Sequence, residues 1–409
     1  MAAGNFSLLD GFLLALATAV AFVMLRPAIR NASFWRAMVT PLASIIGSGF
    51  LVVVPLLASV AGPLAVVAIV GIVLLSFWLG AAIRFNIVHD GRNPPDEPDG
   101  AIQALEHFSD IALAFAYVIS ITFYIRLMCS FVLAGVHTHT DFNADILATG
   151  VLAFIGLYGW RRGLHGLERL EEYSVTIKLA IIASLLAGLI FFDVTHGFDL
   201  SGLPRPDKGV WEALRELGGM VLIVQGFETS KYLESSYDAP LRARSMHVAQ
   251  VVAGVIYIAF VALCLPLMGP LARAVPSETA IIDLSATITL ILPLMLVVAA
   301  SMSQFSAAVA DTIGAGGVVE KEARGRLAGQ TSYPFITALA IGVVWTCNIF
   351  EVVALASRAF AFYYMLQALL AARLAYRLDD DRRQWRVGSY VVQATLLLAI
   401  ALFAKPVAT

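Results

Sequence analysis

The stretch "IIGSGF", residues 45–50, lies inside an apolar segment that is long enough to cross a membrane. Its two glycines, Gly47 and Gly49, flank Ser48. A glycine inside a helix costs about 1 kcal/mol relative to alanine, and an unpaired backbone amide in hydrocarbon costs still more. The stretch therefore predicts a helix that is weakened within the membrane. We interpret the weakening either as close packing of two helices or as an unwound turn whose amides bind a polar ligand.

Hydrophobic residues make up 59% of the 409 residues, and charged residues only 14%. A soluble domain carries about 25% charged residues, so the composition predicts a polytopic protein embedded in a lipid bilayer. The net charge of -2 gives no indication of nucleic-acid binding. The three cysteines fall in apolar segments and are interpreted as small core residues, so we expect no disulfide, no metal site and no cofactor.

Apolar segments of about 20 residues are long enough to span the hydrocarbon core. The first of them has no basic region before it, and it is interpreted as a span rather than a cleaved signal peptide. The sequence predicts an all-α integral membrane protein with twelve transmembrane helices, at about 8–26, 37–60, 63–86, 108–134, 143–160, 172–192, 212–233, 246–268, 280–306, 333–349, 352–376 and 387–404.

Lys and Arg are distributed unevenly over the connections between these spans. Nineteen of the 27 fall on one side, beginning with Arg26, Arg30 and Arg36 after the first span. Because cytoplasmic loops carry an excess of Lys and Arg, we predict that this side is cytoplasmic. An even number of spans then places both termini outside, in the cell (inner) membrane.

A second span is also interrupted by glycines. It reads "GGMVLIVQGFETSKYLESS", residues 218–236, and it carries Glu228. A carboxylate within a span is a functional hypothesis by default, because an isolated charge is costly there. With the first span set aside, the two interrupted spans are the first and sixth of a ten-helix core, which is the spacing of inverted five-helix repeats. The expected parts are an extra N-terminal helix with a basic loop (1–36), a first repeat (37–193), a second repeat (194–377) and a C-terminal helix (378–409).

Four patterns, in this order, resemble the amino acid–polyamine–organocation (APC) transporter superfamily. They are "SIIGSGFLVVVPLLASVAGP" (44–63), "GWRRGLHGLERLEEYSVTIKLAII" (159–182), "MVLIVQGFETS" (220–230) and "ASRAFAFYYMLQALLAARLAYR" (356–377). The resemblance covers about residues 37–377 and implies a LeuT-type fold of two inverted five-helix repeats, here with one extra helix at each end. Residues 222–224, "LIV", depart from the family, which usually has aromatic residues there.

The resemblance implies that the backbone amides at residues 47–49 face a substrate carboxylate or another anion near the middle of the membrane. The substrate would then lie between the two interrupted helices. The substrate-binding residues expected on this basis are Ser44, Gly47, Ser48, Gly49, Ile223, Val224, Gln225, Gly226 and Phe227.

Ion coupling is expected to involve Lys178, Glu228, Ser301 and Ser303. The resemblance implies that Lys178 fills the place where sodium-coupled relatives hold an ion, and burial makes a lysine easier to deprotonate; the alternative is snorkelling to the headgroups. Glu228 is expected either to bind a proton or to accept hydrogen bonds from unwound amides. The serines bind a cation or bond back to their own helix. Asp311 is expected near the membrane edge, in contact with water.

Two arginines fall in the outer halves of their spans, Arg126 and Arg358. Arginines beside a central site would attract anions, and we add Arg126 to the predicted substrate-binding residues. The alternative is that each arginine pairs with a carboxylate or snorkels to the surface.

These expectations converge on a secondary active transporter that moves a small polar solute by alternating access. The expected substrate is an amino acid or a related carboxylated compound, with a proton rather than sodium as the coupling ion. Polar Gln225 and the missing aromatic residues leave an inorganic-ion carrier of the same fold open. The extra span 8–26 leaves a non-transporting membrane receptor or assembly subunit open. An enzyme is not expected, because no nucleophile, base and orienting group can be assembled within the spans.

Overall fold

The computed structural model describes residues 7–47, 49–89, 99–135, 138, 140–200, 202–204, 206, 208–273, 280–324, 326, 328–346, 349–378 and 381–405. Within these ranges every regular element is a helix, so the predicted all-α class is confirmed. Eight helices of the described chain are long and apolar enough to cross a membrane. This supports a multi-pass membrane protein, while the count of twelve spans and the inverted repeat remain predictions.

The helices of the N-terminal half are α1 (Leu8–Met24), α2 (Pro27–Arg30), α3 (Ser33–Ile45), α4 (Gly49–Val60), η1 (Gly62–Leu64), α5 (Ala65–His89), α6 (Gly100–Gly135) and α7 (Asp141–His196). Those of the C-terminal half are α8 (Val210–Met220), η2 (Val221–Val224), η3 (Phe227–Tyr232), α9 (Ala239–Cys264), η4 (Leu265–Leu267), α10 (Met268–Arg273), α11 (Ala280–Ser285), α12 (Leu292–Glu322), α13 (Gly329–Thr346), α14 (Ile349–Arg377) and α15 (Arg383–Phe403).

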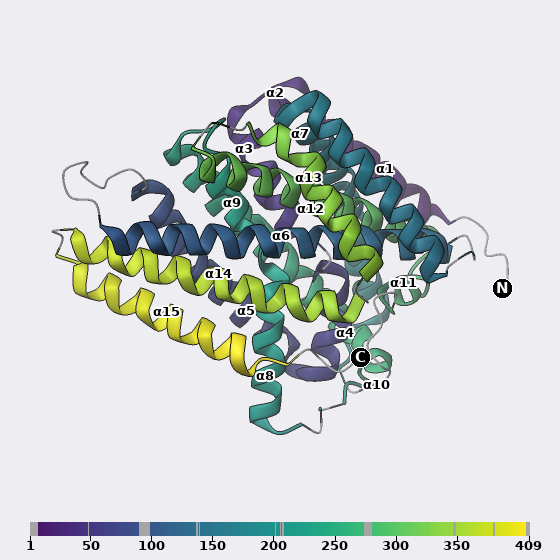
Figure 1. Cartoon of the computed structure of the whole chain (residues 1–409). Coiled ribbons are helices and arrows are strands. Elements are labelled where there is room, and N and C mark those ends of the chain that lie inside the picture. The colour runs from purple at the N-terminus through teal and green to yellow at the C-terminus, as the bar shows by residue number, and fades with distance from the viewer. Residues whose placement is uncertain are drawn as a thin grey trace.

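The arrangement places the α3–α4 segment inside and α15 at the edge. α6 and α14 lie side by side across the middle of the molecule, and α15 packs against α14 (Figure 1). α12 packs against α6 and α7, and both α3 and α5 pack against α9. In the most apolar stretch of Ser33–Val60, 82% of the residues are buried, against 28% in α15. The α3–α4 segment is therefore enclosed by protein, which allows non-helical backbone at membrane depth.

Two helices differ from the predicted spans. The predicted spans 143–160 and 172–192 both lie in α7, whose two halves meet at a kink where Gly163 has φ 64°. A positive φ favours glycine. The predicted span 280–306 ends too early, because α12 continues to Glu322 and is buried along most of its length. Small and polar residues lower the hydropathy after 306, but packing against other helices keeps the segment helical and buried.

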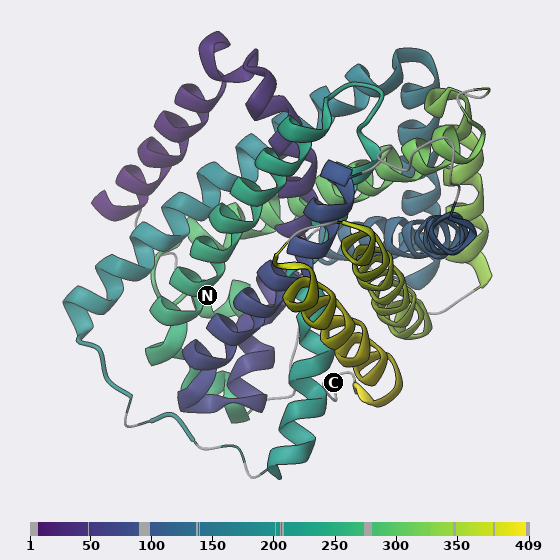
Figure 2. The same cartoon turned by 90° about the vertical axis from the view of Figure 1, so that its left-hand side faces the viewer.

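The first helix, α1, is attached to the rest of the molecule at two points. Figure 2 shows it in purple, running along the outside of the molecule, and it packs against α7. Leu13 is completely buried, and the Ser184 hydroxyl donates to the Leu13 carbonyl at 2.8 Å. The Asp10 carboxylate accepts the backbone N–H of Ile291, the N-cap residue of α12, at 3.1 Å. The extra N-terminal helix therefore caps another helix.

The C-terminal end of α15 is bonded to α8. The Arg215 side chain donates to the Phe403 carbonyl at 2.7 Å, and the backbone N–H of Lys405 donates to the Arg215 carbonyl at 3.2 Å. These bonds join two elements that are far apart in the sequence.

Candidate functional site

The helix break predicted from "IIGSGF" lies between α3 and α4. The last helical bond of α3 runs from the N–H of Ile46 to the carbonyl of Leu42, at 3.1 Å, and Ile46 itself has φ −87° and ψ 60°. α4 begins at Gly49, and the N–H of Phe50 bonds to the carbonyl of Gly47 at 3.4 Å. Ser48, one of the predicted substrate-binding residues, lies outside the described residues. The carbonyls at the end of α3 therefore need partners other than their own helix.

The second interrupted segment consists of α8, η2, two non-helical residues and η3. The two residues are Gln225 and Gly226, and Gly226 has φ 109°. Residues other than glycine adopt this backbone region only at a cost. The predicted glycine thus ends one helical segment and allows the chain to turn into the next.

The two interrupted segments touch each other directly. A Cβ added at Gly49 would lie 2.6 Å from the carbonyl oxygen of Ile223, and a Cβ at Gly226 would lie 2.7 Å from the carbonyl carbon of Ser44. Only glycine fits at either contact. The structure therefore brings the predicted residues Ser44, Gly49, Ile223 and Gly226 together in a closed arrangement.

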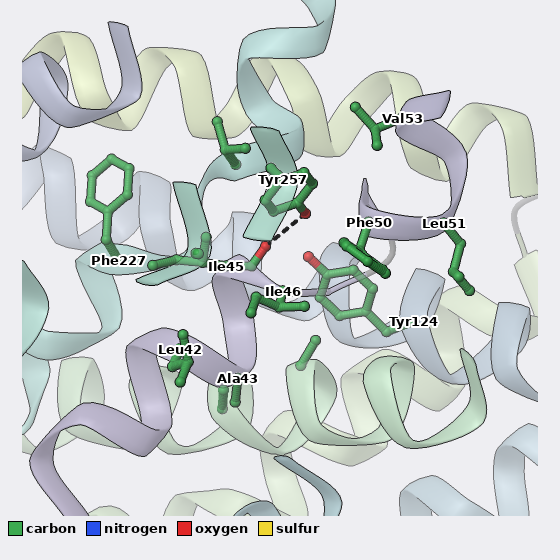
Figure 3. Packing of buried hydrophobic residues seen from close by; sticks show 14 of the residues in the cluster. Leu42, Ala43, Ile45, Ile46, Phe50, Leu51, Val53, Tyr124, Phe227 and Tyr257 are labelled. Carbon is green, nitrogen blue, oxygen red and sulfur yellow. Dashed lines mark hydrogen bonds between the residues drawn. The ribbon is translucent and has the colours of Figure 1, made fainter. Parts of the chain in front are cut away.

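Tyr257 of α9 bonds to both interrupted segments. Its hydroxyl lies 3.1 Å from the carbonyl of Ile45 and 3.2 Å from the carbonyl of Ile223, and Figure 3 shows it pointing at Ile45. A hydroxyl has one hydrogen to donate, so the two carbonyls share it. Tyr257 was not singled out in the sequence, although it is a lone polar tip in the apolar run "GVIYIAF".

Lys178 of α7 lies at the C-terminal end of α3. Its ammonium group donates to the carbonyls of Ala43 and Ile46, at 2.8 and 2.6 Å, and to the hydroxyl of Ser306 at 2.9 Å. The side chain is completely buried, so it does not snorkel to the surface. A cation at a helix C-terminus is favourable because the carbonyls there carry partial negative charge.

The serines of α12 differ in their partners. Ser303 donates to the carbonyls of Ile46 and Gly47, at 2.7 and 3.0 Å, and so lies directly at the break. Ser301 bonds back to the carbonyl of Val297 in its own helix at 2.9 Å. Of the two predicted serines, only Ser303 contacts the break.

Glu228 accepts hydrogen bonds from its own interrupted segment. One carboxylate oxygen accepts the N–H of Gly226 at 3.0 Å and the hydroxyl of Tyr364 of α14. The other oxygen, Oε1, is buried without a hydrogen-bond partner within the described part of the chain. Glu228 is fully buried. Its bond from the N–H of Gly226 agrees with the expectation that it accepts an unwound amide, and its Oε1 remains available to a ligand or a proton.

Asp311 corrects one expectation. It was expected near the membrane edge in contact with water, but its side chain is 1% exposed. It accepts hydrogen bonds from Ser44 of α3, at 3.0 Å, and from Ser120 of α6. The error follows from ending the span at 306, which placed Asp311 beyond the membrane. Asp311 and Ser120 lie beside the first break, although the sequence predicts neither of them there.

Two of the remaining residues of the second break contact α5 and α14. The carbonyl of Val224 accepts the hydroxyl of Ser76 of α5 at 2.9 Å. Phe227 is 1% exposed, and its ring lies 5.2 Å from that of Tyr364. The side-chain oxygen of Gln225 is buried without a hydrogen-bond partner among the described groups, so it is available to a ligand.

The two arginines have different surroundings. Arg126 forms an ion pair with Asp145 of α7 at 2.9 Å, and its side chain is 11% exposed. Arg358 is exposed. The ion pair corresponds to the alternative in which an arginine pairs with a carboxylate.

Polar contacts close the side of the site that the sequence predicts to be cytoplasmic. Glu168 of α7 accepts bonds from Arg36, at 2.9 Å, and from Tyr237, at 2.8 Å. Deeper in, Thr40 of α3 donates to Glu171 at 2.8 Å. These contacts join α3, α7 and the segment after η3.

The family assignment rests on a match over most of the chain. A family model described as "APC superfamily transporter" matches residues 27–404. The chain belongs to the APC superfamily of transporters. This APC transporter is also 42% identical, over 387 residues, to an uncharacterized protein of Aquifex aeolicus (strain VF5), with 94% of each chain covered.

Two solved structures share the fold of this APC transporter. The crystal structure of MhsT in complex with L-phenylalanine has a TM-score of 0.59 at 15% identity, and covers 91% of this chain and 99% of that one. A mutant manganese transporter of Eremococcus coleocola has a TM-score of 0.53 at 14% identity, and covers 91% and 87%. Both are LeuT-fold transporters, so the resemblance that the sequence indicated is confirmed at the level of family and fold.

Proposed function

We propose that this APC transporter is a secondary active transporter that moves an amino acid or a related carboxylated compound by alternating access. The observation that carries the proposal is the direct contact of two interrupted helices, at Gly49 with Ile223 and at Gly226 with Ser44. Interrupted helices that meet inside a membrane protein supply backbone groups for a polar ligand. The substrate would separate the two contacts, with Gln225 offering a further hydrogen-bonding group.

Lys178 supports coupling to protons, or transport that is independent of sodium. Sodium needs several oxygen ligands, and the carbonyls of Ala43 and Ile46 with the hydroxyl of Ser306 would be suitable ones. Here the ammonium group of Lys178 bonds to all three. The chain thus provides its own cation at the end of α3. Lys178 and Glu228, with Ser303 beside them, are the residues we assign to ion coupling, and symport is the expected mode.

The proposal includes the architecture predicted from the sequence: twelve spans, with parts at 1–36, 37–193, 194–377 and 378–409, and both termini outside a cell (inner) membrane. Helices in equal positions of the two proposed repeats pack against each other, namely α5 against α9 and α6 against α12. Such pairing supports a pseudo-symmetric core.

Arg126 remains a proposed substrate-binding residue. Its charged side chain is nearly buried and forms an ion pair with Asp145. In the proposed function, a substrate carboxylate replaces Asp145 as the partner of Arg126. Exchange of one carboxylate for another keeps the guanidinium paired, which is required at low dielectric.

An inorganic-ion carrier on the same fold is the second candidate, since one structural neighbour is a manganese transporter. No group of three or more His, Cys, Asp or Glu side chains that could hold a metal ion occurs among the described residues. The support for an organic solute is the side-chain oxygen of Gln225, which is buried and unpartnered in the described part of the chain, and the backbone groups at the two breaks. A non-transporting receptor would bind the ligand without taking it up, and only the absence of uptake would distinguish it from a carrier.

The experiment begins with thermal stabilisation of the purified protein by amino acids, dicarboxylates, amines and salts of manganese and potassium, because a ligand of the folded state raises its Tm. The class of compound that raises the Tm is then tested as a radiolabelled solute in sodium-free proteoliposomes, with and without an inward proton gradient. Accumulation of a carboxylated solute driven by the proton gradient is the expected result. Uptake of only manganese or rubidium would favour the ion carrier, and stabilisation without any uptake would favour the receptor.

A further inference from the structure

Asp311 is a buried carboxylate at the point where three helices meet. It lies on α12 and is 1% exposed. One oxygen accepts the hydroxyl of Ser44 of α3 at 3.0 Å, and the other accepts the hydroxyl of Ser120 of α6. No Lys, Arg or His forms an ion pair with it within the described ranges. The sequence predicts no function for Asp311.

An ionised carboxylate in such a place is costly, because neither water nor a cation compensates its charge. The titratable groups of the neighbouring elements that are near enough to interact electrostatically with Asp311 are Glu228 of η3, Glu171 of α7, and Tyr117 and Tyr124 of α6. Two of these are acids and two are phenols, so none provides a positive charge.

Lys178 is a buried cation of the neighbouring α7, but its hydrogen bonds go to Ala43, Ile46 and Ser306. Within the described residues, no ion pair therefore compensates the charge that an ionised Asp311 would carry.

The partners of Asp311 suit both of its protonation states. A serine hydroxyl can donate to a carboxylate oxygen, and it can also accept a hydrogen bond from a protonated carboxyl group. Ser44 and Ser120 need only rotate their hydroxyl hydrogens when Asp311 gains or loses a proton. A backbone N–H or an ammonium group could not reverse its role in this way. The hydrogen-bond partners of Asp311 therefore suit it both with and without a proton.

Two neighbouring polar groups lack partners. The hydroxyl of Tyr117 is completely buried without a hydrogen-bond partner among the described groups, and it lies beside Gly314, one helical turn after Asp311. Oε1 of Glu228 is also unpartnered and buried. Buried polar groups without partners are rare, and they often mark a place where a proton, water or ion is bound.

Ser44 connects Asp311 to the two interrupted segments. The same serine packs against Gly226. The two interrupted segments therefore touch at the residue whose hydroxyl donates to Asp311. Separation of the segments would move Ser44 away from Asp311 and admit water. Hydration stabilises the ionised form of a carboxylic acid.

We propose that Asp311 binds the coupled proton of this transporter: it holds the proton while the two interrupted segments touch, and releases it to water when Ser44 moves away. The inference rests on the proposed function as a proton-coupled carrier. The proton is taken from water on one side of the membrane and returned to water on the other, so no other bond forms or breaks. Lys178 and Glu228 keep their proposed part in ion coupling: Glu228 provides the second buried carboxylate, and Lys178 holds the end of α3 in the position that proton exchange at Asp311 requires.

The direct test is infrared difference spectroscopy of the purified full-length protein, titrated from about pH 5 to about pH 9. A protonated carboxyl group absorbs separately from a carboxylate. The wild-type protein is expected to show a buried protonated carboxyl band that Asp311→Asn removes. If the Asn variant retains every such band, the proposal is overturned.

A matched control is Glu216→Gln, because Glu216 is also buried but is paired with Lys208 at 2.7 Å. An ion-paired carboxylate stays ionised, so this variant is expected to leave the protonated band in place; loss of the band in it would contradict the assignment. If Asp311→Asn does not fold, Ser120→Ala serves instead. It removes one hydrogen bond and should shift the band in frequency, and an unshifted band overturns the proposal.

Transport separates this inference from the proposed function. In proteoliposomes, Asp311→Asn is expected to lose accumulation driven by a proton gradient while retaining exchange of labelled for unlabelled solute. The solute used is the class that stabilises the wild-type protein. Gradient-driven accumulation that persists in the variant would overturn the inference and leave the proposed function intact. Absence of uptake by the wild-type protein for every solute would overturn the proposed function itself.

Discussion

Gly226 and Ser44 lie against each other where the two interrupted helices cross: a Cβ at Gly226 would be 2.7 Å from the carbonyl carbon of Ser44. Gly226 also has φ 109°, which only glycine adopts at little cost. One residue therefore meets two separate requirements, a backbone conformation and a close contact. The two interrupted segments therefore touch with no room for a side chain at this point.

Gly226→Ala is expected to destabilise the protein and abolish transport. The positive φ costs an alanine about 1–2 kcal/mol, and the overlap with Ser44 adds about 1–3 kcal/mol. Thermal unfolding in detergent measures the stability. The control is Gly71→Ala, in α5, where a Cβ would meet nothing within 4 Å; it should be neutral or slightly stabilising. Equal effects of the two substitutions would contradict the role assigned to Gly226.

Lys178→Met is expected to lower the Tm and to remove proton dependence of uptake. It leaves the buried carbonyl of Ala43 without this donor, at a cost of about 1–3 kcal/mol, whereas the carbonyl of Ile46 keeps its hydrogen bond from Ser303. Lys208→Met provides the comparison, because it removes a lysine that is 26% exposed and paired with Glu216 outside this site. If sodium restores the stability of the Lys178 variant, the ammonium group stands in for a sodium ion. A Tm unchanged by Lys178→Met would argue against any structural role of its hydrogen bonds.

Tyr257→Phe is expected to loosen the contact between the two interrupted segments. The substitution removes the one donor shared by the carbonyls of Ile45 and Ile223, at a cost of about 1–3 kcal/mol. Thermal unfolding and exchange of the backbone amides around the breaks provide the measurement. Tyr333→Phe, at another buried tyrosine, controls for the loss of a hydroxyl as such. Faster exchange at the breaks in both variants, or in neither, would refute the prediction.

Glu168→Gln is expected to favour opening on the side predicted to be cytoplasmic. It replaces a carboxylate that accepts bonds from Arg36 and Tyr237 with a neutral amide. Arg36 is 40% exposed, so solvent screening limits the effect to about 1 kcal/mol, or about a fivefold gain of the open form. Labelling of a cysteine placed at buried Ala37 measures the opening. Glu322→Gln, in an exposed pair with His107, should not change the labelling rate.

Glycine positions were predicted well because they act through local backbone chemistry. The breaks at residues 47–49 and near Gly226 follow from residues that weaken a helix, and the helical fold follows from apolar segments of membrane length. No such local signal marks Tyr257 or Asp311, whose roles depend on the partners that other helices bring to them. Asp311 was misplaced because hydropathy falls after residue 306, whereas contacts with α3 and α6 keep that part of α12 buried.

The bonds between Arg215 and the end of α15 make position 405 a reporter of α8, the first part of the second interrupted helix. A tilt of α8 must either pull the chain end along or break the bonds from Arg215 to Phe403 and from Lys405 to Arg215. Lys405 is exposed, whereas Cys129 and Cys264 are buried. A fluorophore attached at residue 405 would therefore follow the movement of α8 from the surface, without a probe being placed inside the site.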